Sequence, residues 1–191
     1  MLEVRNLHVA EVLELKPRRI GDARGFFSET FNQGRFAEAG IDISWVQDNQ
    51  SFSQAPFTLR GLHYQAPPFA QAKLVRLLRG RAFDVAVDLR QGSPTFGRWA
   101  SLELSAEAFN QIFVPVGFAH GILTLEPDTE IFYKVSAPYS AAHDRTIRYD
   151  DPTFGIAWPL AGREPQLSPK DEAAPGFAAT GTPFVFQGAT P

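Results

Sequence analysis

The residues best suited to chemistry form one short stretch, Arg60-Gly61-Leu62-His63-Tyr64-Gln65. It combines a permanent cation, a glycine, a titratable imidazole, a phenol and an amide. Burying such polar groups in a hydrophobic core costs free energy unless each of them is hydrogen-bonded. The ordinary pKa of an imidazole is about 6.5, so His63 can take up and release a proton near neutral pH. The stretch therefore predicts an enzyme site in which His63 transfers protons.

Two later stretches carry residues that suit the same site, namely Lys73-Leu74-Val75-Arg76 and Pro115-Val116-Gly117-Phe118-Ala119-His120-Gly121. The second matches the later half of the cupin pattern, in which a proline and glycine turn leads into a strand with an inward histidine. The earlier half normally bears two histidines one residue apart for a metal, but here it reads His63-Tyr64-Gln65. Two histidines without cysteine make a poor transition-metal site. We therefore expect a metal-free barrel with Lys73 as the electrophile. The structural alternative for each histidine alone is a core residue bonded to backbone carbonyls.

Bulk properties favour one soluble domain without a macromolecular partner. The 191 residues fit a single domain over 1–191, whose part from about residue 150 is expected to wrap the barrel. A net charge of −3 gives no reason to expect nucleic acid or an anionic membrane as partner. The chain has no cysteine, no signal-peptide pattern and no run of apolar residues able to cross a bilayer. A cytoplasmic location is the expectation.

Short strands separated by glycine and proline dominate the rest of the chain, with 15 residues of each type. The clearest signal is strict alternation of Phe83, Val85, Val87 and Leu89 with polar or small residues, which predicts a strand paired in a hairpin with 73–78. A helix is expected over 33–39 after the cap Asn32, and another after Ser168. The other predicted strands are 12–16, 26–31, 43–53, 58–65, 99–104, 111–114, 120–125 and 130–135. Together they predict a mostly β, cupin-like jelly-roll barrel.

Several longer stretches carry a family resemblance. They are Arg60 to Gln65, Gln71-Ala-Lys-Leu-Val-Arg76, Phe83-Asp-Val-Ala-Val-Asp-Leu-Arg90, Ser93-Pro-Thr-Phe-Gly-Arg-Trp99, Gly117-Phe-Ala-His-Gly121, Phe132-Tyr-Lys134 and Asp151-Pro-Thr-Phe-Gly-Ile-Ala-Trp-Pro159. In these runs the chain resembles the dTDP-4-dehydrorhamnose 3,5-epimerases, from about Val12 to Pro175. The resemblance implies a cofactor-independent, cupin-like homodimer that acts on a dTDP-4-keto-6-deoxy sugar.

The chemistry of such a reaction can be assigned to particular side chains. Epimerising a carbon beside a ketone requires removing its proton, holding the enolate and returning a proton to the other face. His63 suits the base, Lys73 suits the enolate oxygen, and the resemblance implies Tyr133 as the returning acid. It also points to Asp171 as the carboxylate that orients His63. The spacing of Ser168, Pro169 and Asp171 alone favours a helix cap instead, and the two roles are compatible.

The resemblance further implies a set of substrate contacts. Arg60, Arg24 and Lys170 are the candidates for the diphosphate, since guanidinium and ammonium groups bind oxygen anions. Phe27 and Glu29 resemble residues that reach, with Arg24, into the neighbouring subunit's site. The remaining expected contacts are Gln47, Asn49, His120 and Tyr139. Asp84 is expected to pair with Lys73 or Arg60.

Three positions depart from the family pattern. Pro138-Tyr139 stands where two consecutive tyrosines are frequent, so stacking on the base falls to Tyr139. Val116 and Phe113 stand where Glu and Trp are common. The alternatives are therefore a mono-epimerase acting on C3 or C5 only, or a 3,4-ketoisomerase on a related nucleotide sugar. A more distant alternative is a non-enzymatic or metal-dependent sugar-binding cupin.

Overall fold

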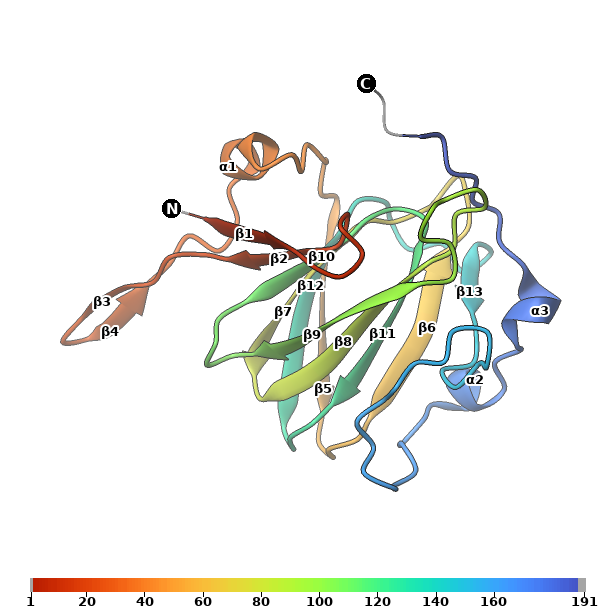
Figure 1. Ribbon diagram of the computed structural model, residues 1–191. Coiled ribbons are helices and arrows are strands. Elements are labelled where there is room, and N and C mark those ends of the chain that lie inside the picture. Colours follow the sequence, from red (N-terminus) through yellow and green to blue (C-terminus); the bar gives the residue numbers. More distant parts are fainter. Residues whose placement is uncertain (1, 189–191) are drawn as a thin grey trace.

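Two antiparallel sheets face each other in the computed structural model, which describes residues 2–188 (Figure 1). The first sheet has the order β1 (Glu3–Asn6), β2 (Leu13–Lys16), β10 (Gln111–Val114), β7 (Lys73–Arg79), β12 (Thr129–Val135) and β5 (Gln47–Ser53). The second has the order β13 (Asp144–Thr146), β6 (Leu59–Gln65), β11 (Phe118–Thr124), β8 (Arg81–Asp88) and β9 (Trp99–Ser105). The expected mostly β, cupin-like fold is confirmed.

The minor elements lie around this sandwich. β3 (Ile20–Asp22) and β4 (Gly25–Phe27) form a separate two-stranded ribbon that projects from the body (Figure 1). The helices are α1 (Gln33–Glu38), α2 (Pro169–Glu172) and α3 (Phe177–Thr180). The predicted caps of the first two helices are present, since the side chains of Asn32 and Ser168 accept hydrogen bonds from backbone amides. No helix in residues 2–188 has the length and hydropathy needed to cross a membrane.

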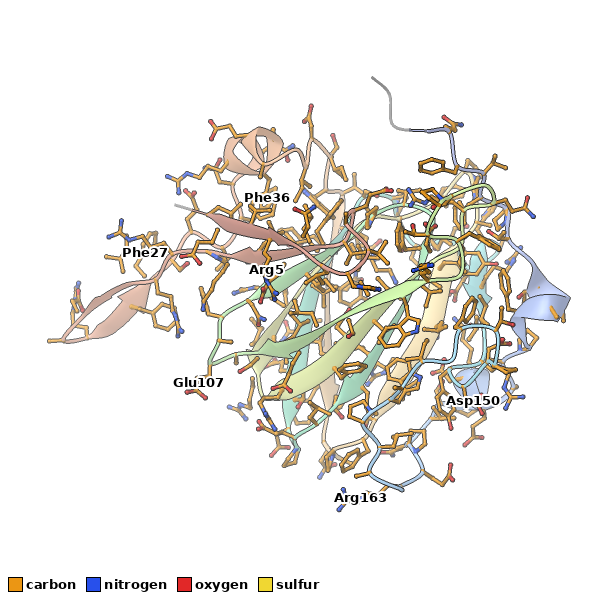
Figure 2. The ribbon with its side chains drawn as sticks, in the orientation of Figure 1. Arg5, Phe27, Phe36, Glu107, Asp150 and Arg163 are labelled. Atoms are coloured by element: carbon orange, nitrogen blue, oxygen red, sulfur yellow. The ribbon has the colours of Figure 1, made fainter. Side chains whose placement is uncertain are left out.

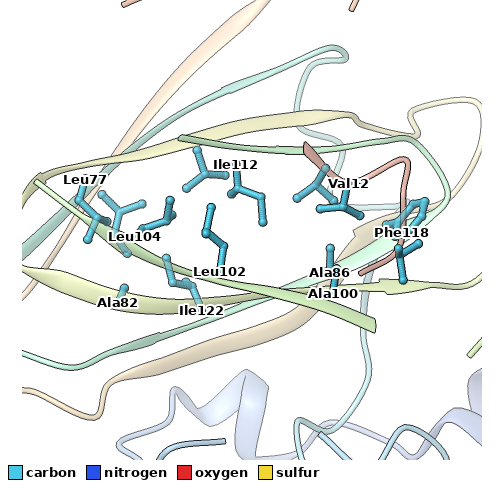
Figure 3. Packing of buried hydrophobic residues seen from close by; sticks show 14 residues of the cluster. Val12, Leu77, Ala82, Ala86, Ala100, Leu102, Leu104, Ile112, Phe118 and Ile122 are labelled. Atoms are coloured by element: carbon cyan, nitrogen blue, oxygen red, sulfur yellow. The ribbon is translucent and has the colours of Figure 1, made fainter. Parts of the chain in front are cut away.

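The main core fills the space between the two sheets (Figure 3). Val75 and Ile112 of the first sheet pack there against Ala86 and Leu102 of the second. Burial of the valine, isoleucine and leucine side chains contributes about 1.5–3 kcal/mol each to the stability of the sandwich. This cluster leaves room for polar side chains elsewhere between the sheets, where the candidate site lies.

Strand β8 is buried on both faces, which explains its alternation. Val85, Val87 and Leu89 pack on the outer side of the second sheet under Phe154 and Phe184 of the C-terminal part. Ala86 faces the inner core, and its neighbours on that face, Asp84 and Asp88, are fully buried. The apolar face is therefore the one covered by the C-terminal part, while the polar face lies inside the sandwich.

The predicted hairpin between 73–78 and 81–89 is wrong. β7 pairs with β10 and β12, whereas β8 pairs with β11 and β9 in the other sheet. Gly80, with φ of 80°, turns the chain from one sheet into the other, and a Cβ there would lie 2.4 Å from the hydroxyl oxygen of Thr129. Alternation identifies a strand but does not identify its partner, because partners are chosen by packing across the whole sandwich.

Two predicted strands are shorter than expected. Strand β4 ends at Phe27, and strand β5 begins only at Gln47. Phe31 and Trp45, which the predicted strands included, instead pack edge to face with ring centroids 6.3 Å apart. They belong to an apolar cluster that covers the outer face of the first sheet. These segments cover a sheet instead of pairing with it.

Candidate active site

A pocket of about 250 Å³ lies between the two sheets. Strands of both sheets supply its walls, and the chain segment around α2 closes one side. Polar and titratable groups dominate its lining, which comprises Ser51, Arg60, His63, Lys73, Val75, His120, Ile122, Ile131, Tyr133, Ser168 and Asp171. Six of the predicted site residues therefore meet in one pocket, namely His63, Tyr133, Asp171, Lys73, Arg60 and His120.

His63 and Asp171 form a hydrogen-bonded pair. Nε2 of His63 lies 2.6 Å from Oδ1 of Asp171, whose side chain is only 3% exposed. The cap interpretation of Ser168 also holds, because its Oγ accepts from the backbone amide of Asp171 at 3.2 Å and donates to Oδ2 at 2.7 Å. The same four-residue helix thus begins at a capping serine and delivers a carboxylate to the imidazole.

Protonation follows from this geometry. Burial would raise the pKa of Asp171, but hydrogen bonds from His63 and Ser168 outweigh it and hold the pKa below its usual value. Burial lowers the pKa of His63, although Asp171 acts in the opposite direction. At neutral pH the carboxylate is therefore ionised and the imidazole neutral. An ionised carboxylate only accepts hydrogen bonds, so Nε2 carries the proton and Nδ1 is left as the base.

Lys73 supplies a cation to the same pocket. Burial lowers the pKa of its ammonium to about 8, although the charges of Asp84 and Asp144 act in the opposite direction. The side chain therefore remains mostly protonated at pH 7 while poorly solvated. A cation held in such surroundings stabilises developing negative charge more strongly than one in water.

A second histidine–carboxylate pair lies beside the first. Nε2 of His120 is 2.9 and 2.8 Å from the two carboxylate oxygens of Asp84, which is fully buried. His120 is the register partner of His63 across β11 and β6. The expected ion pair of Asp84 with Lys73 or Arg60 is not among the contacts of residues 2–188, because the position of Asp84 on the inner face of β8 brings it to His120 on the neighbouring strand. Its charge nevertheless acts on Lys73.

Tyr133 faces the pocket from the opposite sheet. It lies on β12 of the six-stranded sheet, whereas His63 lies on β6 of the five-stranded sheet. Burial raises the pKa of the Tyr133 hydroxyl, which keeps it protonated at neutral pH. Arg60 is fixed by hydrogen bonds from its guanidinium to the carbonyl of Phe52 at 3.3 Å and to Oγ of Ser53 at 3.2 Å. The pocket thus has a neutral imidazole on one wall and a protonated phenol on the other.

Gly61 allows the two histidine strands to approach each other. Its φ is 127°, and a Cβ there would lie 2.7 Å from both the Cα of Gly121 and the carbonyl oxygen of His120. The pairing of β6 with β11 shifts register at this point. A side chain at position 61 would therefore push apart the strands that bear His63 and His120.

Four further predicted residues lie around the Tyr133 end of the site without lining the pocket. Asn49 is the register partner of Tyr133. The side-chain amide of Gln47 donates a hydrogen bond to Oδ1 of Asn49 at 2.7 Å. The backbone amide of Tyr139 donates to Oε1 of Gln47. The hydroxyl of Tyr139 donates to the carboxylate of Asp144 at 3.3 Å. Nζ of Lys170 lies 2.5 Å from the same carboxylate. Sequence reasoning missed Asp144, since nothing in Ala141-Ala142-His143-Asp144 distinguishes it from a loop.

The remaining predicted contacts do not reach this pocket. Arg24 lies between β3 and β4 and pairs with Asp22. Phe27 is 70% exposed on the projecting ribbon (Figure 2). Glu29 pairs with Arg35 at 3.0 Å. The structure therefore does not bring Arg24, Phe27 and Glu29 together with His63 of the same chain.

No group of three or more His, Cys, Asp or Glu side chains suited to one metal ion occurs in residues 2–188. Gln65, which stands where a cupin ligand is frequent, is buried and bonded elsewhere. Its amide donates to the carbonyls of Phe69 and Pro138, and its carbonyl accepts from the amide of Ser140. It fastens the segment that carries Tyr139.

Two of the departures from the family pattern lie away from the pocket. Val116 is 43% exposed beside the C-terminal segment. Phe113 is buried against Trp45 on the outer face of the first sheet, with ring centroids 6.4 Å apart. Neither contributes to the pocket lining.

Comparisons with known proteins show the family of this chain. The family model for dTDP-4-dehydrorhamnose 3,5-epimerase matches residues 6–179. A dTDP-4-dehydrorhamnose 3,5-epimerase of Sinorhizobium fredii is 51% identical over 182 residues, which cover 95% of this chain and 93% of that protein.

Two crystal structures extend the comparison. A dTDP-6-deoxy-D-glucose-3,5-epimerase of Legionella pneumophila in complex with dTDP-4-keto-L-rhamnose has a TM-score of 0.92 and 43% identity, covering 98% of this chain and 100% of that one. A 3′-monoepimerase of Streptomyces bikiniensis in complex with dTDP-quinovose has a TM-score of 0.84 and 36% identity, covering 91% and 87%. This chain belongs to the dTDP-4-dehydrorhamnose 3,5-epimerase family.

Proposed function

We propose that the protein epimerises C3 and C5 of a dTDP-4-keto-6-deoxy-hexose, converting dTDP-4-dehydro-6-deoxy-glucose to dTDP-4-dehydro-L-rhamnose in dTDP-L-rhamnose biosynthesis. The observation that carries the proposal is the arrangement of His63 and Tyr133 on opposite sheets of one pocket that also holds Lys73. Inversion requires a base and an acid on opposite faces of the reacting carbon, and these two walls supply them.

Each inversion uses the same groups. Nδ1 of His63 removes the proton from the carbon beside the ketone, and Asp171 stabilises the imidazolium that forms. The electron pair moves to the ketone oxygen, where the ammonium of Lys73 stabilises the enolate by about 3–4 kcal/mol if it acts like an oxyanion-hole donor. Tyr133 then donates its hydroxyl proton to the carbon from the other face and recovers one from solvent, while the imidazolium of His63 releases its proton to solvent and is ready for the second carbon. The proposal uses no metal or cofactor.

The same proposal assigns the substrate contacts. Arg60 and His120 contact the bound molecule in the pocket, and Gln47, Asn49, Tyr139 and Lys170 contact the nucleotide part. We propose a homodimer in which Arg24, Phe27 and Glu29 complete the neighbouring subunit's site, supported by the projection of their ribbon away from the chain's own pocket (Figure 1). The single domain over 1–191 and the cytoplasmic location stay predictions.

Deuterium incorporation tests the reaction. In D₂O with a dTDP-4-keto-6-deoxy-glucose, the native protein is expected to place deuterium at both C3 and C5. His63→Ala is expected to fold and to lose this exchange, whereas Tyr133→Phe retains exchange at one centre and loses complete inversion. Exchange that survives in His63→Ala would overturn the mechanism.

A mono-epimerase is the second candidate, since a 3′-monoepimerase shares the fold at 36% identity. Label at one carbon only in the native protein would establish it. Formation of a 3-keto sugar would indicate a ketoisomerase instead. Iron, zinc or manganese bound at one equivalent per chain, with activity lost on chelation, would favour a metal-dependent cupin.

A further inference from the structure

Three side chains without a polar atom form one part of the otherwise polar pocket wall. They are Val75 on β7, Ile131 on β12 and Ile122 on β11, and all three are buried. All three also belong to the main core cluster between the sheets, in which Ile122 is labelled in Figure 3. The pocket therefore borders the hydrophobic core, and we call these three side chains the apolar floor. The proposed reaction leaves them without a role.

Strand register places the apolar floor beside the groups of the proposed reaction. Val75 lies directly opposite Tyr133 in the pairing of β7 with β12. Val75 also follows Lys73 by two residues on β7, so both side chains project from one face into the pocket, with their Cα atoms about 6–7 Å apart. A sugar whose ketone oxygen contacts the ammonium of Lys73 therefore has its neighbouring carbons within reach of Val75.

The proposed substrate carries one apolar group on its sugar. The hexose ring has hydroxyls at C2 and C3, the ketone at C4 and the nucleotide at C1, whereas C5 bears the C6 methyl group. Because C5 is bonded to the ketone carbon, the methyl group lies next to the oxygen that contacts Lys73. The polar groups of the ring match the polar part of the wall, and only the methyl group gains free energy from contact with apolar side chains.

We propose that the apolar floor binds the C6 methyl group, and that Val75, Ile122 and Ile131 thereby select 6-deoxy sugars over sugars with a hydroxyl at C6. The inference rests on the proposed function, from which it takes the sugar and the position of its ketone. Val75 and Ile131 belong to one sheet and Ile122 to the other. The methyl group therefore keeps apolar neighbours when the configuration of C5 changes.

The expected selectivity follows from the chemistry of the floor. A hydroxyl at C6 would lie against three side chains that offer it no hydrogen bond, and leaving such a group unpaired costs free energy. Apolar sites discriminate against an added hydroxyl by about 10²-fold, and one methyl or methylene group in them changes affinity by about 10- to 200-fold. The floor therefore predicts weaker binding both when a hydroxyl is added at C6 and when C6 is removed.

Calorimetric titration of the native protein with three stable analogues tests this selectivity. Instead of a ketone they have a hydroxyl at C4, and at C5 dTDP-quinovose bears a methyl group, dTDP-glucose a hydroxymethyl group and dTDP-xylose only hydrogen. The Kd for dTDP-quinovose is expected to be about 10- to 100-fold lower than that for either of the others. Equal Kd values for dTDP-quinovose and dTDP-glucose would overturn the proposal.

Val75→Thr assigns the selectivity to the floor, since it adds a hydroxyl with little change of shape. The ratio of the Kd for dTDP-glucose to that for dTDP-quinovose is expected to fall by at least about fivefold. Val114→Thr is the matched control, because Val114 is also 1% exposed and lies in the same core cluster but does not line the pocket. It is expected to keep the native ratio. A native ratio in folded Val75→Thr would overturn the assignment.

These measurements separate the inference from the reaction on which it rests. Binding of the analogues requires no turnover, and the comparison in the native protein holds even if Val75→Thr does not fold. Absent deuterium exchange in the native protein, with a preserved preference for dTDP-quinovose, overturns the proposed reaction alone. Exchange at C3 and C5, with equal binding of dTDP-quinovose and dTDP-glucose, overturns the role of the apolar floor alone.

Discussion

Nε2 of His63 and Oδ1 of Asp171 lie 2.6 Å apart, although 108 positions separate the two residues in the chain. The contact joins β6 to the C-terminal helix α2 and sets which imidazole nitrogen carries the proton. Because Nε2 is engaged by the carboxylate, the pair leaves Nδ1 as the nitrogen available to act as the proposed base.

The first prediction concerns this carboxylate. Asp171→Asn retains the volume but removes the charge that stabilises an imidazolium. We expect kcat to fall by about 10²–10⁴-fold. Because Asp171 raises the pKa of His63, its loss is expected to move the acid limb of the kcat/KM profile to lower pH. A native pH profile in the variant would contradict the role of Asp171.

The basic limb of the profile is expected to report Lys73. Its pKa of about 8 means that the ammonium is lost as the pH rises through that value. The enolate then loses its cation, so kcat/KM is expected to fall above about pH 8. Lys73→Arg keeps its charge at that pH and is expected to abolish this limb. A basic limb that persists unchanged in Lys73→Arg would assign it to another group.

The lowered pKa of Lys73 also predicts an effect on the stability of the fold. The pKa of Lys73 lies below its unfolded value of about 10.4, so the fold disfavours the ammonium. This cost is fully present below about pH 8 and disappears as the pH rises to about 10.4. Lys73→Met is expected to raise the free energy of unfolding at pH 7 by about 1–3 kcal/mol while activity falls. The free energies are measured by denaturant titration. Lys16→Met, which makes the same substitution at an exposed position, is the control and is expected to change the free energy of unfolding little. A lower stability of Lys73→Met than of the native protein would contradict this prediction.

Gly61→Ala tests the close approach of β6 and β11. Its Cβ would meet the Gly121 backbone at 2.7 Å in addition to the unfavourable φ of 127°. We expect the free energy of unfolding, measured by thermal denaturation, to fall by at least about 2 kcal/mol and activity to be lost. Gly92→Ala also has positive φ, but its Cβ meets nothing within 4 Å. The Gly92→Ala variant is expected to have a free energy of unfolding about 1–2 kcal/mol lower than the native protein and to remain active. Equal effects of the two substitutions would exclude a role for the close approach.

The contribution of Arg24 to a neighbouring subunit is testable by mixing. Arg24→Ala and His63→Ala subunits, each expected to be inactive, are unfolded together and refolded. If the two residues serve one site from different chains, a mixed dimer has one intact site, and about a quarter of native activity is expected because half of the dimers are mixed. Each variant refolded alone controls for residual activity. No recovery in the mixture, with dimers shown by light scattering, would place both residues in one chain's site.

The sequence alone determined most of the longer strands and the caps of α1 and α2, but not the short strands β1, β3 and β13. Local patterns suffice for the strands and caps that it did determine. Asn32 and Ser168 act within their own helix turn, and alternation is a property of the strand itself. The grouping of His63, Lys73, His120 and Tyr133 followed from a family resemblance combined with the chemistry of their side chains, and the pocket confirms that they meet.

Only the tertiary structure decided which residues pair across long separations. Asp84 bonds to His120 because β8 and β11 are neighbouring strands. Strands β7 and β8 do not pair, although they are consecutive in the chain, because packing places them in different sheets. Asp144 reaches Lys170 through β13, in a segment with no local pattern. Such contacts depend on strand order and register. These are set by the free energy of burying the whole core, and no short stretch of sequence contains that information.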